Sequence, residues 1–137
     1  MSFNPYVFFS GNCAEAFARY HEIFGGELMV MTHGELPEGA EPMPGATPEM
    51  VMHASITIGE GILMGSDDPT GDDGPKTGVA VSYTAPDTET GAKVFAALCE
   101  GGEEQMPFEP TFWSPGFGAC VDRFGVSWMV DTTADEG

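Results

Sequence analysis

Positively charged residues are almost missing from this sequence. Its 137 residues include four Lys and Arg against 22 Asp and Glu, which gives a formal net charge of −18 at pH 7. The four basic residues are scattered, so they provide no positive surface that could neutralise a phosphate backbone or anionic lipid headgroups. We therefore expect neither nucleic acid nor a membrane as a partner, and we expect the acidic surface to repel anionic ligands at long range.

Long apolar runs and paired cysteines are missing too. The N-terminal segment has no basic stretch, and its short apolar run is too brief for a signal sequence or a membrane span. The three cysteines, Cys13, Cys99 and Cys120, are odd in number and show no C-x-x-C spacing, so we expect them to be reduced. Together these absences predict a cytoplasmic protein.

The chain nevertheless has enough apolar residues for a folded domain. Hydrophobic residues make up 42% of the sequence. A chain of this size buries about two-thirds of its unfolded surface and is short for two independent domains. We therefore predict a single domain over residues 1–137.

One order of elements occurs twice along the chain. The first half predicts a strand, a helix with Asn12 as N-cap, and three further strands, at residues 4–10, 13–24, 27–33, 50–58 and 62–66. The second half predicts the same order, with a helix capped by Asp87 or Thr88, at residues 78–84, 88–100, 105–108, 118–122 and 125–131. Each half is therefore βαβββ.

Such a half leaves an apolar sheet face that a second copy could cover. We therefore predict an α+β fold in which two βαβββ modules form an open, curved, mixed sheet around a cavity. Module one covers about residues 1–67, an acidic hinge covers 67–76, and module two covers about 77–132.

Three segments carry a resemblance to a known family: NPYVFFSGNCAEAFARYHEIFGG, VMHASITIGEGILMGSD and CVDRFGVSWMVD. In order and spacing they resemble the vicinal oxygen chelate superfamily, which includes glyoxalase I, bleomycin-resistance proteins and extradiol dioxygenases, and especially its PhnB-like branch. The resemblance covers nearly the whole chain. It implies a glyoxalase-like fold and a homodimer.

The resemblance also implies four metal-ligand positions, which fall at Pro5, Val79, Met64 and Met129. Proline and valine have no donor side chain, and a thioether suits copper(I) rather than zinc, magnesium or iron. We therefore expect no metal and no cofactor. The methionines fit an adaptable apolar lining better, with ordinary core packing as the alternative.

His53 is the polar residue of greatest interest. Strand alternation places it with Ser55 and Thr57, opposite Met52 and Ala54, where it could act as a general base or orient a ligand. A histidine hydrogen-bonded between strands is the alternative. The predicted cavity lining around it consists of Tyr6, Phe8, Ser55, Met64, Val81, Trp113 and Met129.

Two other assignments are not favoured. The acidic residues Asp67, Asp68, Asp72 and Asp73 lack the order of a calcium loop, so a solvated linker is expected. Some PhnB-like proteins carry a demethylubiquinone methyltransferase label, but the sequence has no strand followed by a glycine-rich turn of the kind that binds a nucleotide-like cofactor.

Three functions remain open. The first is a PhnB-like binding protein of unknown physiological role that holds a small, partly apolar molecule without the metal; the acidic surface suits a cationic ligand. The second is an enzyme, of isomerase, lyase or dioxygenase type, using His53 or a metal held by non-standard ligands. The third is an interaction module with a collapsed cavity.

Overall fold

A computed structural model describes residues 4–35, 47–69 and 78–132. The chain divides into two compact units, Met1–Asp73 and Gly74–Gly137. The boundary lies inside the acidic hinge that the sequence predicts. The grouping of the two units into one domain stays a prediction.

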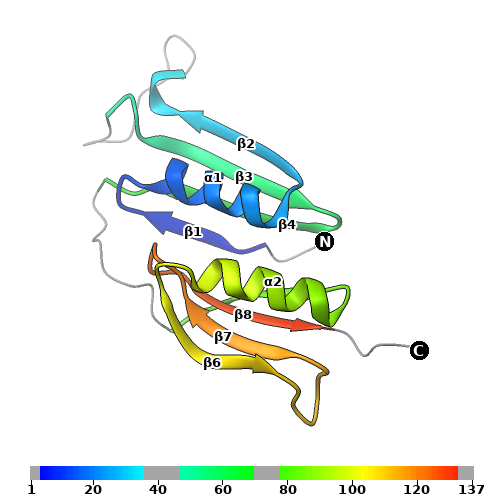
Figure 1. Cartoon of the computed structure of the whole chain (residues 1–137). Coiled ribbons are helices and arrows are strands. Elements are labelled where there is room, and N and C mark those ends of the chain that lie inside the picture. The colour runs from blue at the N-terminus through cyan, green and yellow to red at the C-terminus, as the bar shows by residue number, and fades with distance from the viewer. Residues whose placement is uncertain (1–3, 36–46, 70–77, 133–137) are drawn as a thin grey trace. The chain divides into compact units, whose positions relative to one another are not determined.

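The first unit is a four-stranded sheet with one α-helix (Figure 1). Its elements are β1 (Tyr6–Phe9), α1 (Cys13–Phe24), β2 (Glu27–Thr32), a 3₁₀ turn (His33–Glu35), β3 (Val51–Ile58) and β4 (Gly61–Asp67). The strand order is β1-β4-β3-β2. β1 runs parallel to β4, whereas the other neighbours are antiparallel.

The second unit repeats this arrangement. Its elements are β5 (Val81–Ala85), α2 (Thr88–Cys99), β6 (Glu103–Glu109), β7 (Phe117–Val121) and β8 (Ser127–Thr132), in the strand order β5-β8-β7-β6. β5 is parallel to β8, as β1 is to β4. The predicted α+β fold of two βαβββ modules with open mixed sheets is therefore confirmed. In the part of the chain that the structure describes, no helix is long and apolar enough to cross a membrane.

Each helix packs on one face of its own sheet. A Cβ atom on Gly65 of β4 would lie 2.8 Å from Cε1 of Phe17 in α1, and one on Gly118 of β7 would lie 2.7 Å from Cε1 of Phe95 in α2. Because side chains alternate along a strand, the neighbours of these glycines point away from the helix. Each unit thus has a helix-covered face and an open face.

The glycine pairs after the two helices are required for the same steric reason. A Cβ atom on Gly26 would overlap the carbonyl oxygen of Thr57, and one on Gly102 would overlap that of Val121. Gly26 also has a φ of 82°, which glycine adopts without strain. Both turns therefore bring backbone directly against the neighbouring strand.

Asp67 is buried, so the prediction that it belongs to a solvated linker is wrong. Its Oδ1 accepts hydrogen bonds from the backbone N–H groups of Gly11 and Cys13, both at 2.9 Å. Its Oδ2 accepts one from Val51 at 2.8 Å. Asp72 and Asp73 of the same predicted linker lie outside the described residues.

This carboxylate also replaces the predicted N-cap of α1. Asn12 makes no side-chain capping hydrogen bond, so the prediction that its side chain caps the helix is wrong. Burial, and secondarily the charge of Asp67, raise the pKa of the Cys13 thiol to about 12. The start of α1 is therefore held by a residue from the far end of β4.

The corresponding helix α2 has the predicted local cap. Asp87 accepts a hydrogen bond from the backbone N–H of Thr90 at 2.7 Å. This bond is the first cause of the lowered pKa of Asp87. The N-terminus of α1 is thus capped by a carboxylate distant in sequence, whereas that of α2 is capped by the residue directly before the helix.

Candidate functional site

The open faces of the two sheets carry matching rows of side chains. Cross-strand pairing aligns Met29, Ser55, Met64 and Tyr6 across β2, β3, β4 and β1. It aligns Met106, Ala119, Met129 and Ser82 across β6, β7, β8 and β5. In each sheet, two methionines therefore flank one small residue, and the row ends in a hydroxyl group.

These methionines are not core residues. Met29 is 51% exposed, Met106 is 46% exposed and Met129 is 36% exposed, and Met64 is half-buried. They alternate with the helix-facing positions that Gly65 and Gly118 mark. A flexible thioether on an open face offers an apolar and adaptable contact surface.

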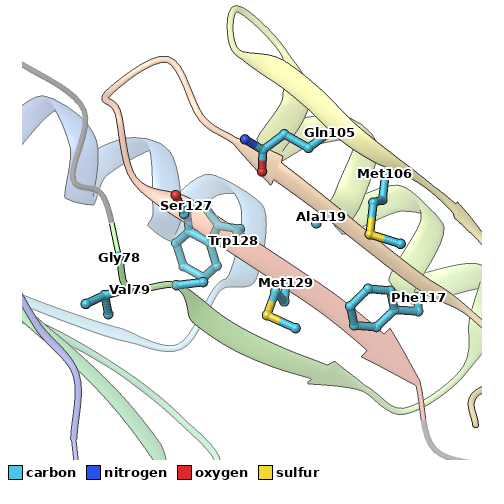
Figure 2. Close-up of a pocket in the computed structure, with 10 residues that line it drawn as sticks. Gly78, Val79, Gln105, Met106, Phe117, Ala119, Ser127, Trp128 and Met129 are labelled. Carbon is cyan, nitrogen blue, oxygen red and sulfur yellow. The ribbon is translucent and has the colours of Figure 1, made fainter.

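A hollow of about 420 Å³ lies on the open face of the second sheet (Figure 2). It is lined by Gly78, Val79, Ala80, Gln105, Met106, Phe117, Ala119, Ser127, Trp128 and Met129. Figure 2 shows Ala119 between the two methionines. Because two strand spacings separate β6 from β8, roughly 10 Å, the small Ala119 leaves a slot between two flexible walls.

A strand irregularity brings a polar group to this slot. The pairing of β6 with β7 shifts between Glu104 and Met106, and a bulge of this kind re-aims side chains. As a result, the successive residues Gln105 and Met106 both line the hollow. The Gln105 amide and the Ser127 hydroxyl are the polar side chains of an otherwise apolar lining.

The open face of the first sheet carries an aromatic and histidine cluster. The Tyr6 hydroxyl lies 3.2 Å from Nδ1 of His53, and the two rings are 5.7 Å apart. Phe8 stacks at 5.2 Å from Tyr6. Tyr6 and Phe8 are exposed, so the cluster is accessible from the open face.

The structure brings together some of the predicted lining residues but not all. Met129 lines the hollow in the second unit. The open face of the first unit carries five other predicted residues: Tyr6, Phe8, His53, Ser55 and Met64. Val81 pairs with Trp128 and is not among the residues that line the hollow. Trp113 stacks at 5.4 Å from Phe117, beside the hollow.

The sequence prediction missed several residues of the site, among them Ala119, Gln105 and Ser127 of the hollow and the methionines Met29 and Met106. Met29 and Met106 occupy the rows of Met64 and Met129, but their partners are distant in sequence. The signal that could have identified them is the repeat itself, because Met29 and Met106 follow the two glycine pairs at nearly the same distance.

The positions that the resemblance implies for a metal, and the strand residues paired with them, are poor ligands. Register pairs Met64 with Tyr6 and Met129 with Ser82, whereas Pro5 and Val79, the first-strand positions that the resemblance implies, lie before the first residues of β1 and β5. Two thioethers, a phenol and a hydroxyl do not form the nitrogen and carboxylate set that zinc, iron or magnesium prefers. Among the described residues, no group of three or more His, Cys, Asp and Glu side chains could hold a metal ion.

Solved structures of other proteins have the same fold as this chain. A glyoxylase/bleomycin resistance protein/dioxygenase domain from Frankia sp. superposes with a TM-score of 0.64 at 13% identity, covering 97% of this chain and 98% of that one. Protein PA1353 from Pseudomonas aeruginosa superposes with a TM-score of 0.83 at 40% identity, covering 97% and 98%. The fold is therefore glyoxalase-like, as predicted.

Sequence comparison then gives the family. Residues 1–131 match the family model described as 3-demethylubiquinone-9 3-methyltransferase. The protein YjdN of Escherichia coli is 30% identical over 144 residues, covering 99% of this chain and 98% of the relative. The PhnB protein from Bacillus cereus superposes with a TM-score of 0.75 at 24% identity, covering 97% and 100%. The chain therefore belongs to this PhnB-like family, and it shares the fold of the glyoxalase/bleomycin resistance/dioxygenase proteins.

Proposed function

We propose that the protein binds a small, partly apolar molecule in the hollow between Met106 and Met129, without a metal ion. The observation that carries this proposal is the slot over Ala119, whose volume of about 420 Å³ falls within the usual range of ligand pockets. A flat ring fits between the two thioethers, and the Gln105 amide and Ser127 hydroxyl can hydrogen-bond to its polar edge.

The net charge of the chain indicates which charge such a molecule would have. With a net charge of −18, the field around the protein attracts cations and repels anions. The ligand class that fits both slot and field is therefore a neutral or cationic aromatic compound. Raising the salt concentration should weaken the binding of a cationic ligand, because the long-range attraction is screened.

Filling the slot tests this proposal. In the Ala119→Leu variant, we expect the affinity for a cationic acridine dye to fall by at least about tenfold, which corresponds to about 1.4 kcal/mol. The reason is steric, since the larger side chain occupies the space between Met106 and Met129. Fluorescence titration measures this change, with the anionic dye anilinonaphthalene sulfonate as the charge-mismatched probe.

A matched variant on the same strand controls for effects on folding. Val121 lies two residues after Ala119 on β7, on the same open face, and is not among the residues that line the hollow. Val121→Leu should therefore bind the acridine as the unmodified chain does. Equal loss in both variants, or no loss in Ala119→Leu, would contradict the proposal.

One observation favours a second candidate, an enzyme that uses His53. In the tautomer in which the Tyr6 hydroxyl donates to Nδ1, Nε2 carries the hydrogen and is available to a ligand on the open face. The imidazole could then donate or accept a proton while Tyr6 fixes its orientation. Phe8 would supply an apolar contact beside it.

Replacing His53 separates the two candidates. Ligands that raise the melting temperature are incubated with the protein, and their conversion is followed by NMR. If the protein is an enzyme of this kind, His53→Ala should lower turnover by about 100-fold or more with dissociation constants changed by less than about threefold. Tyr6→Phe, which keeps the ring but removes the hydroxyl, should give a smaller loss. Conversion that persists in His53→Ala would exclude this role.

A further inference from the structure

Cys99 and Cys120 face each other between α2 and β7. Cys99 is the last residue of α2 and is half-buried, and Cys120 is buried on β7. Phe95 lies one helical turn before Cys99, Gly118 lies two residues before Cys120, and the Phe95 ring packs directly against Gly118. This contact fixes the position of the helix over the strand.

The geometry of the helix and the strand also places the two cysteines next to each other. β7 is antiparallel to β8, which is parallel to β5, and α2 returns after β5, so α2 and β7 run in the same direction. Four helical residues advance about 6 Å and two strand residues advance about 6.8 Å. Moving from Phe95 to Cys99 and from Gly118 to Cys120 therefore brings the two thiols together, and they share a side-chain hydrogen bond.

We propose that Cys99 and Cys120 are a redox-active pair that forms an intramolecular disulfide by exchange with a small-molecule disulfide such as oxidised glutathione. The more exposed Cys99 thiolate attacks the small disulfide, which gives a mixed disulfide and releases one small thiolate. The Cys120 thiolate then attacks the Cys99 sulfur and expels the second small thiolate. The two protein thiols are oxidised, the small disulfide is reduced to two thiols, and these take up both protons.

The bond would connect the end of α2 to the strand that carries the candidate site. Cys120 is adjacent to Ala119, which lines the hollow. Oxidation would therefore tie the helix to the part of β7 on whose opposite face a ligand is expected. The third cysteine, Cys13, is fully buried in the other unit and has no part in this exchange.

The reaction should be slow at neutral pH and faster at alkaline pH. Burial is the main cause that raises the pKa of both thiols, the negative charges of Glu104 and, for Cys120, of Asp122 raise it further, and the pKa of Cys120 reaches about 12. Because the thiolate is the attacking form, its fraction at pH 7 is small and grows about tenfold per pH unit below the pKa. The rate of disulfide formation should rise with pH accordingly.

Mass spectrometry of the full chain tests the proposal. The native protein is incubated with oxidised glutathione at pH 7 and pH 8.5, alkylated, and cleaved by a glutamyl-specific protease, which cuts between the two cysteines at Glu100. We expect linked peptides containing Cys99 and Cys120, a chain mass lower by two hydrogen atoms, faster formation at pH 8.5, and a melting temperature that drops when reductant is added. Cys13→Ala should keep the link, whereas Cys99→Ser and Cys99→Ala should abolish it.

Two results would overturn the proposal. One is a glutathione adduct on Cys99 that persists while Cys120 stays open to alkylation after denaturation. The other is that both thiols remain free in the folded protein under conditions that oxidise the urea-denatured chain. Either result would mean that the thiols pack together but cannot reach bonding geometry.

Discussion

Replacing Asp67 with Ala is expected to destabilise the protein by about 3 to 5 kcal/mol, because three backbone N–H groups lose their acceptor. Asp67 is 2% exposed, and each unsatisfied buried donor costs about 1 to 3 kcal/mol. A loss of this size is a large fraction of the stability of an ordinary domain. Urea denaturation followed by circular dichroism measures the change in the free energy of unfolding.

The two halves provide a matched control for this prediction. Thr132 on β8 corresponds to Asp67 on β4, because each lies three residues after the methionine of its strand, Met129 or Met64. It is also buried, and its Oγ1 has no hydrogen-bond partner among the described residues. Thr132→Val keeps the shape and removes only that hydroxyl, so we expect a change below about 1 kcal/mol. Similar effects of both substitutions would show that the three hydrogen bonds to Asp67 contribute little.

Replacing Gly26 with Ala should have a comparable effect, about 3 kcal/mol or more, for a different reason. The new Cβ atom would overlap the carbonyl oxygen of Thr57 in β3, so the turn after α1 would have to move away from the sheet. The positive φ of 82° adds strain of about 1 to 2 kcal/mol. The same denaturation experiment measures the loss.

Gly59 provides a control that separates the strain of a positive φ from the overlap of the new Cβ atom with the backbone. It also has a positive φ, 57°, but nothing lies within 4 Å of the Cβ position. Gly59→Ala should therefore cost only the strain, about 1 to 2 kcal/mol. If Gly26→Ala cost no more than Gly59→Ala, the close approach of the turn to Thr57 would not be the reason for glycine at this position.

Local patterns in the sequence account for most of the fold. α1 ends at residue 24 as predicted, with Gly25-Gly26 directly after it, and Asp87 caps α2 as predicted, because both signals lie within a few residues of the structure that they form. Asp122 accepts hydrogen bonds from the backbone N–H groups of Phe124 and Val126, which is a local pattern typical of an Asp beside a turn. The repeat of these signals is sufficient to predict two βαβββ modules.

The remaining features depend on contacts between residues far apart in sequence. Asp67 resembles a linker residue because three other acids follow it closely, and its burial depends on donors from β3 and the start of α1. Met106 joins the row of Met129 only through a pairing that contains a bulge. Such a register cannot be counted from alternation alone, because one extra residue exchanges the two faces of a strand.

The separation of a helix-covered face from an open face has a consequence for how this protein can evolve. Residues that hold the fold, such as Gly65 and Gly118, alternate along the same strands with residues that would meet a ligand, such as Met64 and Ala119. If the protein binds a ligand as proposed, a substitution on the open face would change which molecule fits and would leave the contacts between helix and sheet in place. Under that proposal, ligand preference could change by single substitutions without any loss of the packing between helix and sheet.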